Sequence, residues 1–256
     1  MSENQTDILF RSARPPDRTE VTGPGPTDLY DVWEPTPERA RGITVALVHG
    51  GFWRAEYDRT HLAPLAEALA RDGFHVANVE YPRTGMDGGG WPGTGAAVRA
   101  RMESVRADEH LPGRVVAVGH SAGGHLALWL ASEDRLPWLT GVVALGPCAD
   151  LREVDRLGLS ADAARDLLGG TREERPDAWA DADPGRQRLT TPAAIVTGEA
   201  DDIVPASVTE AYRAGRADGE PLSTAVARRA DHFDLVDPAT DAYLLVLAEV
   251  EELTLR

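Results

Sequence analysis

Short apolar runs without polar alternation recur along the chain, a pattern typical of strands that are buried on both faces of a parallel sheet. Five such runs are rich in Val, Ala, Ile and Leu, namely Ile43–Val48, His75–Val79, Val115–Val118, Gly141–Leu145 and Ala193–Val196. Two weaker runs are Ser223–Arg228 and Leu29–Trp33. The pattern predicts that these runs form the strands of one sheet.

Helical spacing of apolar residues fills most of the segments between these runs. In Arg59–Arg71, for example, Leu62, Leu65 and Leu69 recur every three or four positions, which puts them on one face of a helix. Strands that alternate with helices predict an α/β fold with a doubly wound, mostly parallel sheet and helices on both of its faces. The other predicted helices are Thr94–Glu109, Ala122–Ser132, Pro205–Ala217 and Asp237–Leu253.

The chain divides into an N-terminal extension and one domain. Residues 1–27 are predicted to be extended or poorly ordered, because residues 11–27 are rich in Arg, Pro, Gly, Thr and Asp. Residues 28–256 form a single α/β domain. Within it, residues 147–192 are acidic, rich in Arg and interrupted by Pro, and they predict an excursion over one edge of the sheet with one short helix, Ala161–Leu168.

Charge and composition exclude several classes of protein. All 26 basic residues among the 256 are Arg, and the absence of Lys rules out Schiff-base chemistry. The 42 acidic residues give a formal net charge of −16, which argues against nucleic-acid and membrane partners. Cys148 is the one cysteine, and neither a signal-like start nor a membrane-spanning apolar run is evident, so we expect a cytoplasmic protein.

A G-x-S-x-G motif, Gly119–Gly123, stands between the strand that begins at Val115 and the helix that begins at Ala122. A serine at such a strand-to-helix corner is held in a strained turn at the carboxyl edge of the sheet. The flanking glycines let other backbone segments pass closely. We therefore predict that Ser121 is a nucleophile, while His120 and His125 are expected to be packing residues.

A glycine pair follows the first strong strand, in His49–Trp53 (His-Gly-Gly-Phe-Trp). Acyl transfer needs N–H donors for the oxygen of the tetrahedral intermediate. One donor is expected at Ala122, directly after the nucleophile, and the second at Gly51 or Phe52. Trp53 is a candidate for the pocket wall, and His49 is expected to brace the loop.

A nucleophilic serine also needs a general base that a carboxylate orients. In folds with this elbow the chain order is Ser, then acid, then His, and after the elbow helix only His232 remains. The acid is predicted to be Asp201, which follows the strand Ala193–Val196. Asp202, beside it, and Asp150, after the strand Gly141–Leu145, are the alternatives.

On these motifs the chain resembles the α/β-hydrolase superfamily, and within it the group of esterases and arylformamidases that carry H-G-G-x-W. Glu80–Arg83 (Glu-Tyr-Pro-Arg) is similar to the E/D-Y-R stretch of those esterases, and Gly119–Ala127 closely matches their nucleophile region. The resemblance extends from about residue 28 to the end of the chain. It implies a Ser–Asp–His triad, hydrolysis of esters or amides, and no cofactor.

The sequence thus predicts a serine hydrolase that cleaves a small acyl ester or an N-formyl or N-acyl arylamide. Two other interpretations stay open, a non-catalytic binding protein of the same fold and an acyltransferase or lactone-processing enzyme. The expected partner is a small-molecule substrate, and no metal site is predicted. The negative net charge of the chain does not attract an anionic substrate. If the substrate carries a carboxylate, we therefore expect a nearby arginine to bind it, and Arg54 and Arg83 are the candidates.

Overall fold

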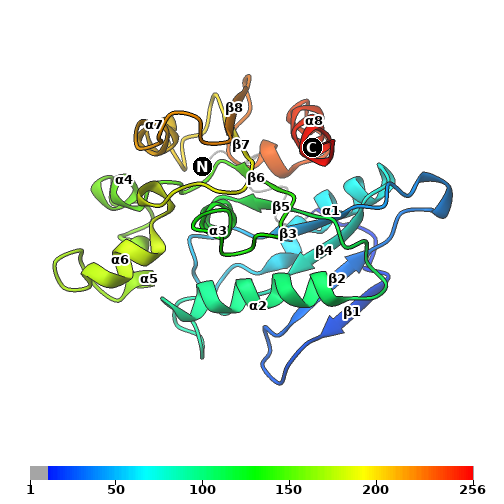
Figure 1. Cartoon of the computed structure of the whole chain (residues 1–256), viewed down its shortest axis with the longest axis horizontal. Helices are drawn as coiled ribbons and strands as arrows, with labels where there is room; N and C mark the ends of the chain where they lie inside the picture. The colour runs from blue at the N-terminus through cyan, green and yellow to red at the C-terminus, as the bar shows by residue number, and fades with distance from the viewer. Residues whose placement is uncertain (1–10, 256) are drawn as a thin grey trace.

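Residues 11–255 are described by the computed structural model, and within them the protein forms one eight-stranded sheet with the order β1-β2-β4-β3-β5-β6-β7-β8. Strands β3 to β8 run parallel, whereas β2 is antiparallel to both of its neighbours. The layers of the molecule are visible in Figure 1. The strands are β1 (Arg18–Val21), β2 (Leu29–Trp33), β3 (Thr44–Val48), β4 (His75–Val79), β5 (Val115–His120), β6 (Gly141–Leu145), β7 (Ala193–Gly198) and β8 (Leu222–Ala227).

The predicted α/β fold is confirmed, because each of the seven apolar runs forms a strand and helices alternate with them. Each predicted helix is present with ends shifted by a few residues: α1 (Ala63–Arg71), α2 (Gly93–Ala107), α3 (Ala122–Leu130), α7 (Ala206–Ala214) and α8 (Ala242–Thr254). A 3₁₀ turn, Arg59–Leu62, precedes α1. Among residues 11–255, no helix combines the length and the apolar character needed to cross a bilayer.

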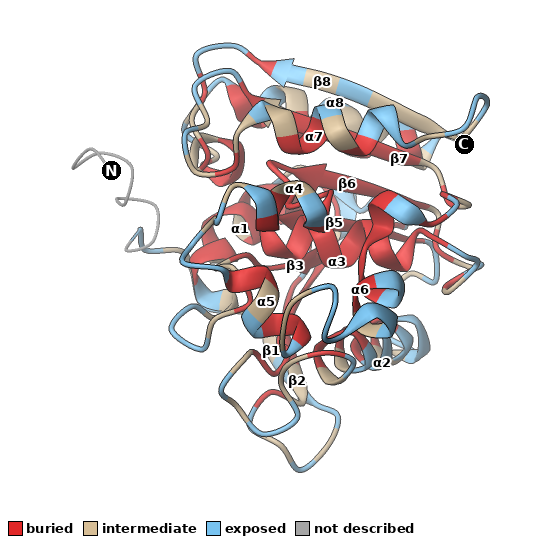
Figure 2. Ribbon diagram, turned by 90° about the vertical axis from the view of Figure 1, so that its left-hand side faces the viewer, coloured by how far each residue is buried: buried red, intermediate tan, exposed pale blue. Residues whose placement is uncertain are grey.

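Alternate residues of each central strand pack on opposite faces of the sheet. Val45 and Leu47 of β3 pack with α1 and α8, whereas Ala46 and Val48 pack with α2 and α3. Both faces are therefore buried, and Figure 2 shows the central strands red from end to end. Burial on both faces explains why the strands are continuous apolar runs. Each buried Val or Leu stabilises the fold by roughly 1.5–3 kcal/mol.

The sheet begins earlier than the boundary predicted at residue 28. Strand β1 (Arg18–Val21) lies inside the predicted extension and pairs with β2, with Arg18 opposite Val32. Its sequence, Arg-Thr-Glu-Val, has no apolar run because an edge strand is held by backbone hydrogen bonds and its side chains stay half-exposed. Residues 1–10, the rest of that extension, lie outside the described residues.

The excursion over residues 147–192 holds more helix than its sequence predicts. Besides α5 (Ala163–Leu168), it contains α4 (Leu151–Arg156) and α6 (Pro176–Ala182). These helices have six or seven residues, too few for a helical period to stand out. Leu151, Leu167 and Trp179 join the core on the α2–α3 face, so the excursion packs onto the sheet and has no separate core.

Candidate active site

Ser121 occupies a strained corner between β5 and α3, with φ 56° and ψ −118°. This left-handed backbone is costly for a residue other than glycine. A Cβ on Gly123 would lie 2.0 Å from the carbonyl oxygen of Val48, and one on Gly119 would lie 2.2 Å from that of Gly123. Only glycine fits at either position, so the turn expected from the G-x-S-x-G motif is present.

His232 and Asp201 form a buried pair beside this corner. Nδ1 of His232 lies 2.7 Å from Oδ2 of Asp201, and both side chains are at most 3% exposed. The other oxygen of Asp201, Oδ1, accepts hydrogen bonds from the backbone N–H groups of Ile203 (3.0 Å) and Val204 (2.8 Å). A carboxylate only accepts, so Nδ1 of His232 carries the proton in this contact and Nε2 is left as an acceptor.

The two alternative acids, Asp150 and Asp202, occupy positions that differ from that of Asp201. Asp150 is the N-cap of α4, where Oδ1 accepts the N–H of Glu153 at 2.9 Å. Asp202 lines the cavity next to Asp201, but the carboxylate that contacts His232 is that of Asp201.

His120 supports the loop that carries His232. Its Nε2–H donates to the backbone carbonyl of His232 at 3.1 Å, and the two rings lie 4.5 Å apart. Burial, together with the neighbouring His232 and His61, lowers the pKa of His120 well below 6.5. His120 is therefore a neutral packing residue, as expected, and so is His125, whose Nε2–H donates to the carbonyl of Ala182 and whose pKa burial lowers to about 4.

The loop after β3 also has left-handed backbone, with φ 101° at Gly51, 48° at Phe52 and 56° at Trp53. Gly51 and Phe52 line the same cavity as Ser121. Ala122, the first residue of α3, is buried next to Ser121, and the first N–H groups of a helix have no acceptor within it. All three predicted oxyanion donors therefore gather around the serine.

A buried network of polar side chains, centred on His49 and Glu80, supports this loop. The His49 ring contacts Oε1 of Glu80 through Nε2 (3.0 Å) and stacks on Tyr81, whose hydroxyl donates to the His49 carbonyl (2.7 Å). Burial opposes ionisation of Glu80, but its hydrogen bond with His49 and the guanidinium of Arg83 outweigh burial and lower its pKa to about 2. The bracing role expected for His49 is confirmed.

Trp53, Arg54 and Arg83, which the sequence predicts to bind substrate, do not line the cavity. Trp53 is fully buried beneath the loop, in edge-to-face contact with His125. Arg83 is buried too, with Nη1 2.7 Å from Oε1 of Glu80. Arg54 reaches the excursion instead, where it bonds the carbonyls of Ser160 and Ala161 and lies 3.2 Å from the Asp166 carboxylate. Each guanidinium is occupied by this chain's own oxygen atoms.

The cavity at the serine has a volume of about 440 Å³, a size suited to a small ligand. Its wall is mostly apolar or aromatic, with a few polar groups among them. Seven of its residues carry no sequence signal, because they come from loops and turns whose spacing forms no motif. The lining residues are Gly51, Phe52, Tyr57, His61, His120, Ser121, Gly158, Leu159, Ser160, Asp202, Ile203, His232 and Phe233.

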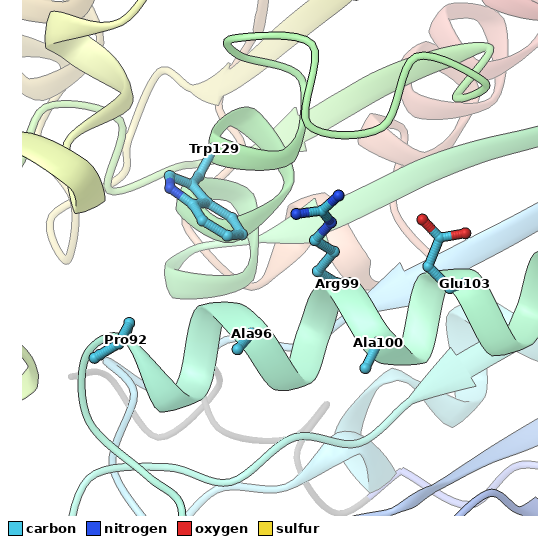
Figure 3. Close-up of a pocket in the computed structure, with 6 residues that line it drawn as sticks. All are labelled: Pro92, Ala96, Arg99, Ala100, Glu103 and Trp129. Carbon is cyan, nitrogen blue, oxygen red and sulfur yellow. The ribbon is translucent and has the colours of Figure 1, made fainter.

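A second hollow, of about 470 Å³, lies between α2 and the end of α3. Figure 3 shows Trp129 above the helix that carries Arg99 and Glu103. Its lining contains no serine, cysteine or histidine and lies away from the corner at Ser121. The first cavity differs, because a serine, a carboxylate-bound imidazole and the segments expected to carry N–H donors meet there, an arrangement that can perform acyl transfer.

Several solved structures that resemble this fold are esterases. Esterase B from Lactobacillus rhamnosus aligns with a TM-score of 0.75 at 17% identity, covering 98% of this chain and 90% of its own. A truncated carbohydrate esterase from gut microbiota aligns at 0.76 and 16%, covering 95% and 100%. The butyrate-bound esterase Est2 from Thermogutta terrifontis aligns at 0.68 and 19%, covering 93% of each chain.

Sequence comparison gives a family. No curated protein matches the chain significantly. The profile of the BD-FAE family, however, matches residues 30–214, which run from β2 to the end of α7 and include the oxyanion loop, the elbow and Asp201. Because this match spans well over half of the 256 residues, the chain belongs to the BD-FAE family of α/β-hydrolase-type esterases.

Proposed function

We propose that the protein is a serine carboxylesterase that hydrolyses small, uncharged acyl esters through an acyl-enzyme on Ser121. The observation that carries the proposal is the contact between His232 and Asp201 on the wall of the cavity that Ser121 lines. That contact supplies an oriented base for a serine that is buried at the sheet edge and lines the cavity.

In the first half of the reaction, Oγ of Ser121 attacks the ester carbonyl carbon while its proton passes to Nε2 of His232. The carbonyl π electrons move to the oxygen, which accepts hydrogen bonds from the N–H of Ala122 and of Gly51 or Phe52. Collapse of this intermediate expels the alcohol, which takes its proton from His232. Asp201 stabilises the imidazolium in between.

In the second half, water attacks the acyl carbon of the ester on Ser121 and gives a proton to His232. The second tetrahedral intermediate collapses, the carboxylic acid leaves, and the proton returns to Oγ of Ser121. Both halves use side chains and backbone N–H groups of this chain together with the ester and one water.

The cavity supports an ester over an anionic arylamide as the substrate. Among residues 11–255, no arginine lines the cavity, and its one acidic lining residue, Asp202, disfavours a carboxylate. An N-formyl arylamide uses the same steps, so arylformamidase activity is a measurable alternative. Butyrate esters are the first choice of probe, because butyrate is the ligand in the Thermogutta esterase.

The test compares p-nitrophenyl butyrate turnover by wild type, Ser121→Ala and Ser160→Ala. Ser160 lines the same cavity, so its variant controls for the loss of any hydroxyl there. We expect Ser121→Ala to lose at least about 10⁴-fold in kcat and Ser160→Ala to stay within a few-fold. Equal activity of wild type and Ser121→Ala would contradict the proposal, and faster turnover of N-formylkynurenine than of butyrate esters would redirect it to the amide.

A further inference from the structure

His61 is one of three histidines on the cavity wall, beside His120 and His232, and the proposed mechanism does not use it. It stands in the 3₁₀ turn before α1 and is 6% exposed. Its ring lies edge-on to His49 at 5.9 Å and 6.3 Å from His120, behind the same wall as Ser121. Among residues 11–255, its hydrogen-bond partner is a backbone carbonyl and not a carboxylate, so it lacks the orienting partner that His232 has as a general base.

The tautomer of His61 follows from its one hydrogen bond. Nδ1 lies 2.7 Å from the backbone carbonyl oxygen of Asp58, which can only accept, so Nδ1 carries a proton. That carbonyl is held in place, since the Asp58 side chain caps the turn and accepts the N–H of Thr60 at 2.9 Å. The ring is therefore fixed at one nitrogen, and Nε2 is left with an acceptor lone pair.

The ring is also uncharged at neutral pH. Burial and the neighbouring His49 lower its pKa to about 4, despite the hydrogen bond to Asp58. A neutral Nε2 accepts a hydrogen bond, whereas an imidazolium would donate one. The wall of the cavity that Ser121 lines thus includes a fixed acceptor, together with Phe52, Leu159 and Phe233.

We propose that Nε2 of His61 accepts a hydrogen bond from a hydroxyl group of the substrate, so that the enzyme selects hydroxylated esters over equally sized esters that lack the hydroxyl. This inference rests on the proposed function. A ligand that covers this acceptor without a donor leaves it unpaired and desolvated, which disfavours that ligand strongly. The hydroxyl can stand on the alcohol or on the acyl group.

The test uses two pairs of substrates in which a hydroxyl replaces a methyl group. The pair 2-hydroxyethyl butyrate and propyl butyrate varies the alcohol, and the pair ethyl 3-hydroxybutyrate and ethyl 3-methylbutyrate varies the acyl group. For wild type we expect kcat/KM to favour the hydroxylated member by about tenfold or more in one pair, which also says where the hydroxyl lies.

Two variants assign that preference to His61. His61→Phe keeps a ring without an acceptor, and we expect the ratio to fall to about one, whereas His61→Gln retains an acceptor and part of the preference. Tyr57→Phe, which removes another polar group of the cavity, should leave the ratio unchanged. A ratio of one in both wild-type pairs, or a ratio that His61→Phe leaves intact, overturns the inference while ester turnover continues. Turnover of no ester at all would remove the proposed function and this inference with it.

Discussion

Two turns that line the same cavity carry left-handed backbone on residues other than glycine, and they are held in opposite ways. At the elbow, Ser121 has φ 56°. The second turn, residues 160–162 in the excursion, is called the rim. Its residues Ser160, Ala161 and Asp162 have φ 49°, 51° and 61° in succession. Each such residue costs roughly 1–2 kcal/mol, so both turns need support from elsewhere in the fold.

The elbow is supported from several sides by buried backbone. The N–H of Ser121 donates to the carbonyl of Leu145 at 2.8 Å, and its own carbonyl accepts from His125 and Cys148. At the rim, the side chain of Arg54, from the loop after β3, bonds the carbonyls of Ser160 and Ala161. The elbow is thus fixed by the core of the sheet, whereas the carbonyls of Ser160 and Ala161 at the rim are held by one half-exposed side chain.

The largest effect is expected from a methyl group at the elbow. In Gly123→Ala the new Cβ would lie 2.0 Å from the Val48 carbonyl oxygen, and backbone cannot move aside cheaply. We expect loss of the folded protein, or a folded protein without esterase activity. Gly219→Ala is the control, because a Cβ there meets nothing within 4 Å and costs only about 1 kcal/mol through its φ of 85°. Circular dichroism and p-nitrophenyl butyrate turnover check both, and full activity of Gly123→Ala would contradict the account of the elbow.

The next largest effect is expected to distinguish Asp201 from Asp202 as the acid that orients His232. Asp201→Asn should lower kcat about 10⁴-fold, because an amide stabilises the wrong tautomer of His232. Asp202→Asn, on the same loop, should stay within a few-fold. Steady-state kinetics of both variants give the answer, and a reversed order would assign the acid to Asp202.

Asp183, a buried carboxylate of the excursion, is expected to make the stability of the protein depend on pH. Asp183 is 1% exposed and accepts the N–H of Leu151, and burial and the nearby charge of Asp150 raise its pKa to about 6. Because the folded pKa exceeds the unfolded value of 3.8, ionisation costs up to about 3 kcal/mol of stability as the pH rises from about 4 to above 6.

Asp183→Asn keeps the acceptor and removes the charge. We expect it to be more stable than wild type above pH 6 by up to about 3 kcal/mol, and the difference should vanish as the pH falls toward 4. Urea unfolding at pH 4, 5, 6 and 8 measures this. A constant difference across that range would show that the ionisation of Asp183 is not the cause.

The smallest effect is expected at the rim. Arg54→Met keeps the length of the side chain but removes its bonds to Ser160 and Ala161, so the strained turn can relax. We expect KM for butyrate esters to rise several-fold with kcat nearly unchanged, and stability to fall by about 1 kcal/mol. Arg156→Met, which loses a surface ion pair with Glu153 on the neighbouring α4, is the matched control. If both variants behave alike, the rim does not depend on Arg54.

The same contrast explains what the sequence could predict. The central strands were readable because burial on both faces leaves continuous apolar runs, and the elbow because glycine is obligatory where the backbones of Val48 and Gly123 meet. His232 and Asp201 were readable because the strand ends set their order along the chain.

The rim and the cavity wall follow no such rule. The position of Arg54 beside the glycine loop predicts a substrate-binding residue. The sequence does not reveal that the Ser160 loop folds against Arg54 and accepts its hydrogen bonds. His61 carries no motif either, because its environment depends on tertiary contacts with His49 and His120. Local sequence constrains the backbone of the elbow, whereas long-range packing decides which side chains reach the cavity.

The most direct test of the central claim is to map the residue that becomes covalently modified. The protein is incubated with a fluorophosphonate, digested, and analysed by peptide mass spectrometry, with Asp201→Asn run in parallel. We expect a single modification on Ser121 in wild type and a much slower one in Asp201→Asn, since the proposed mechanism activates the serine through His232. Modification of another residue, or none, would contradict the assignment of Ser121 as the nucleophile.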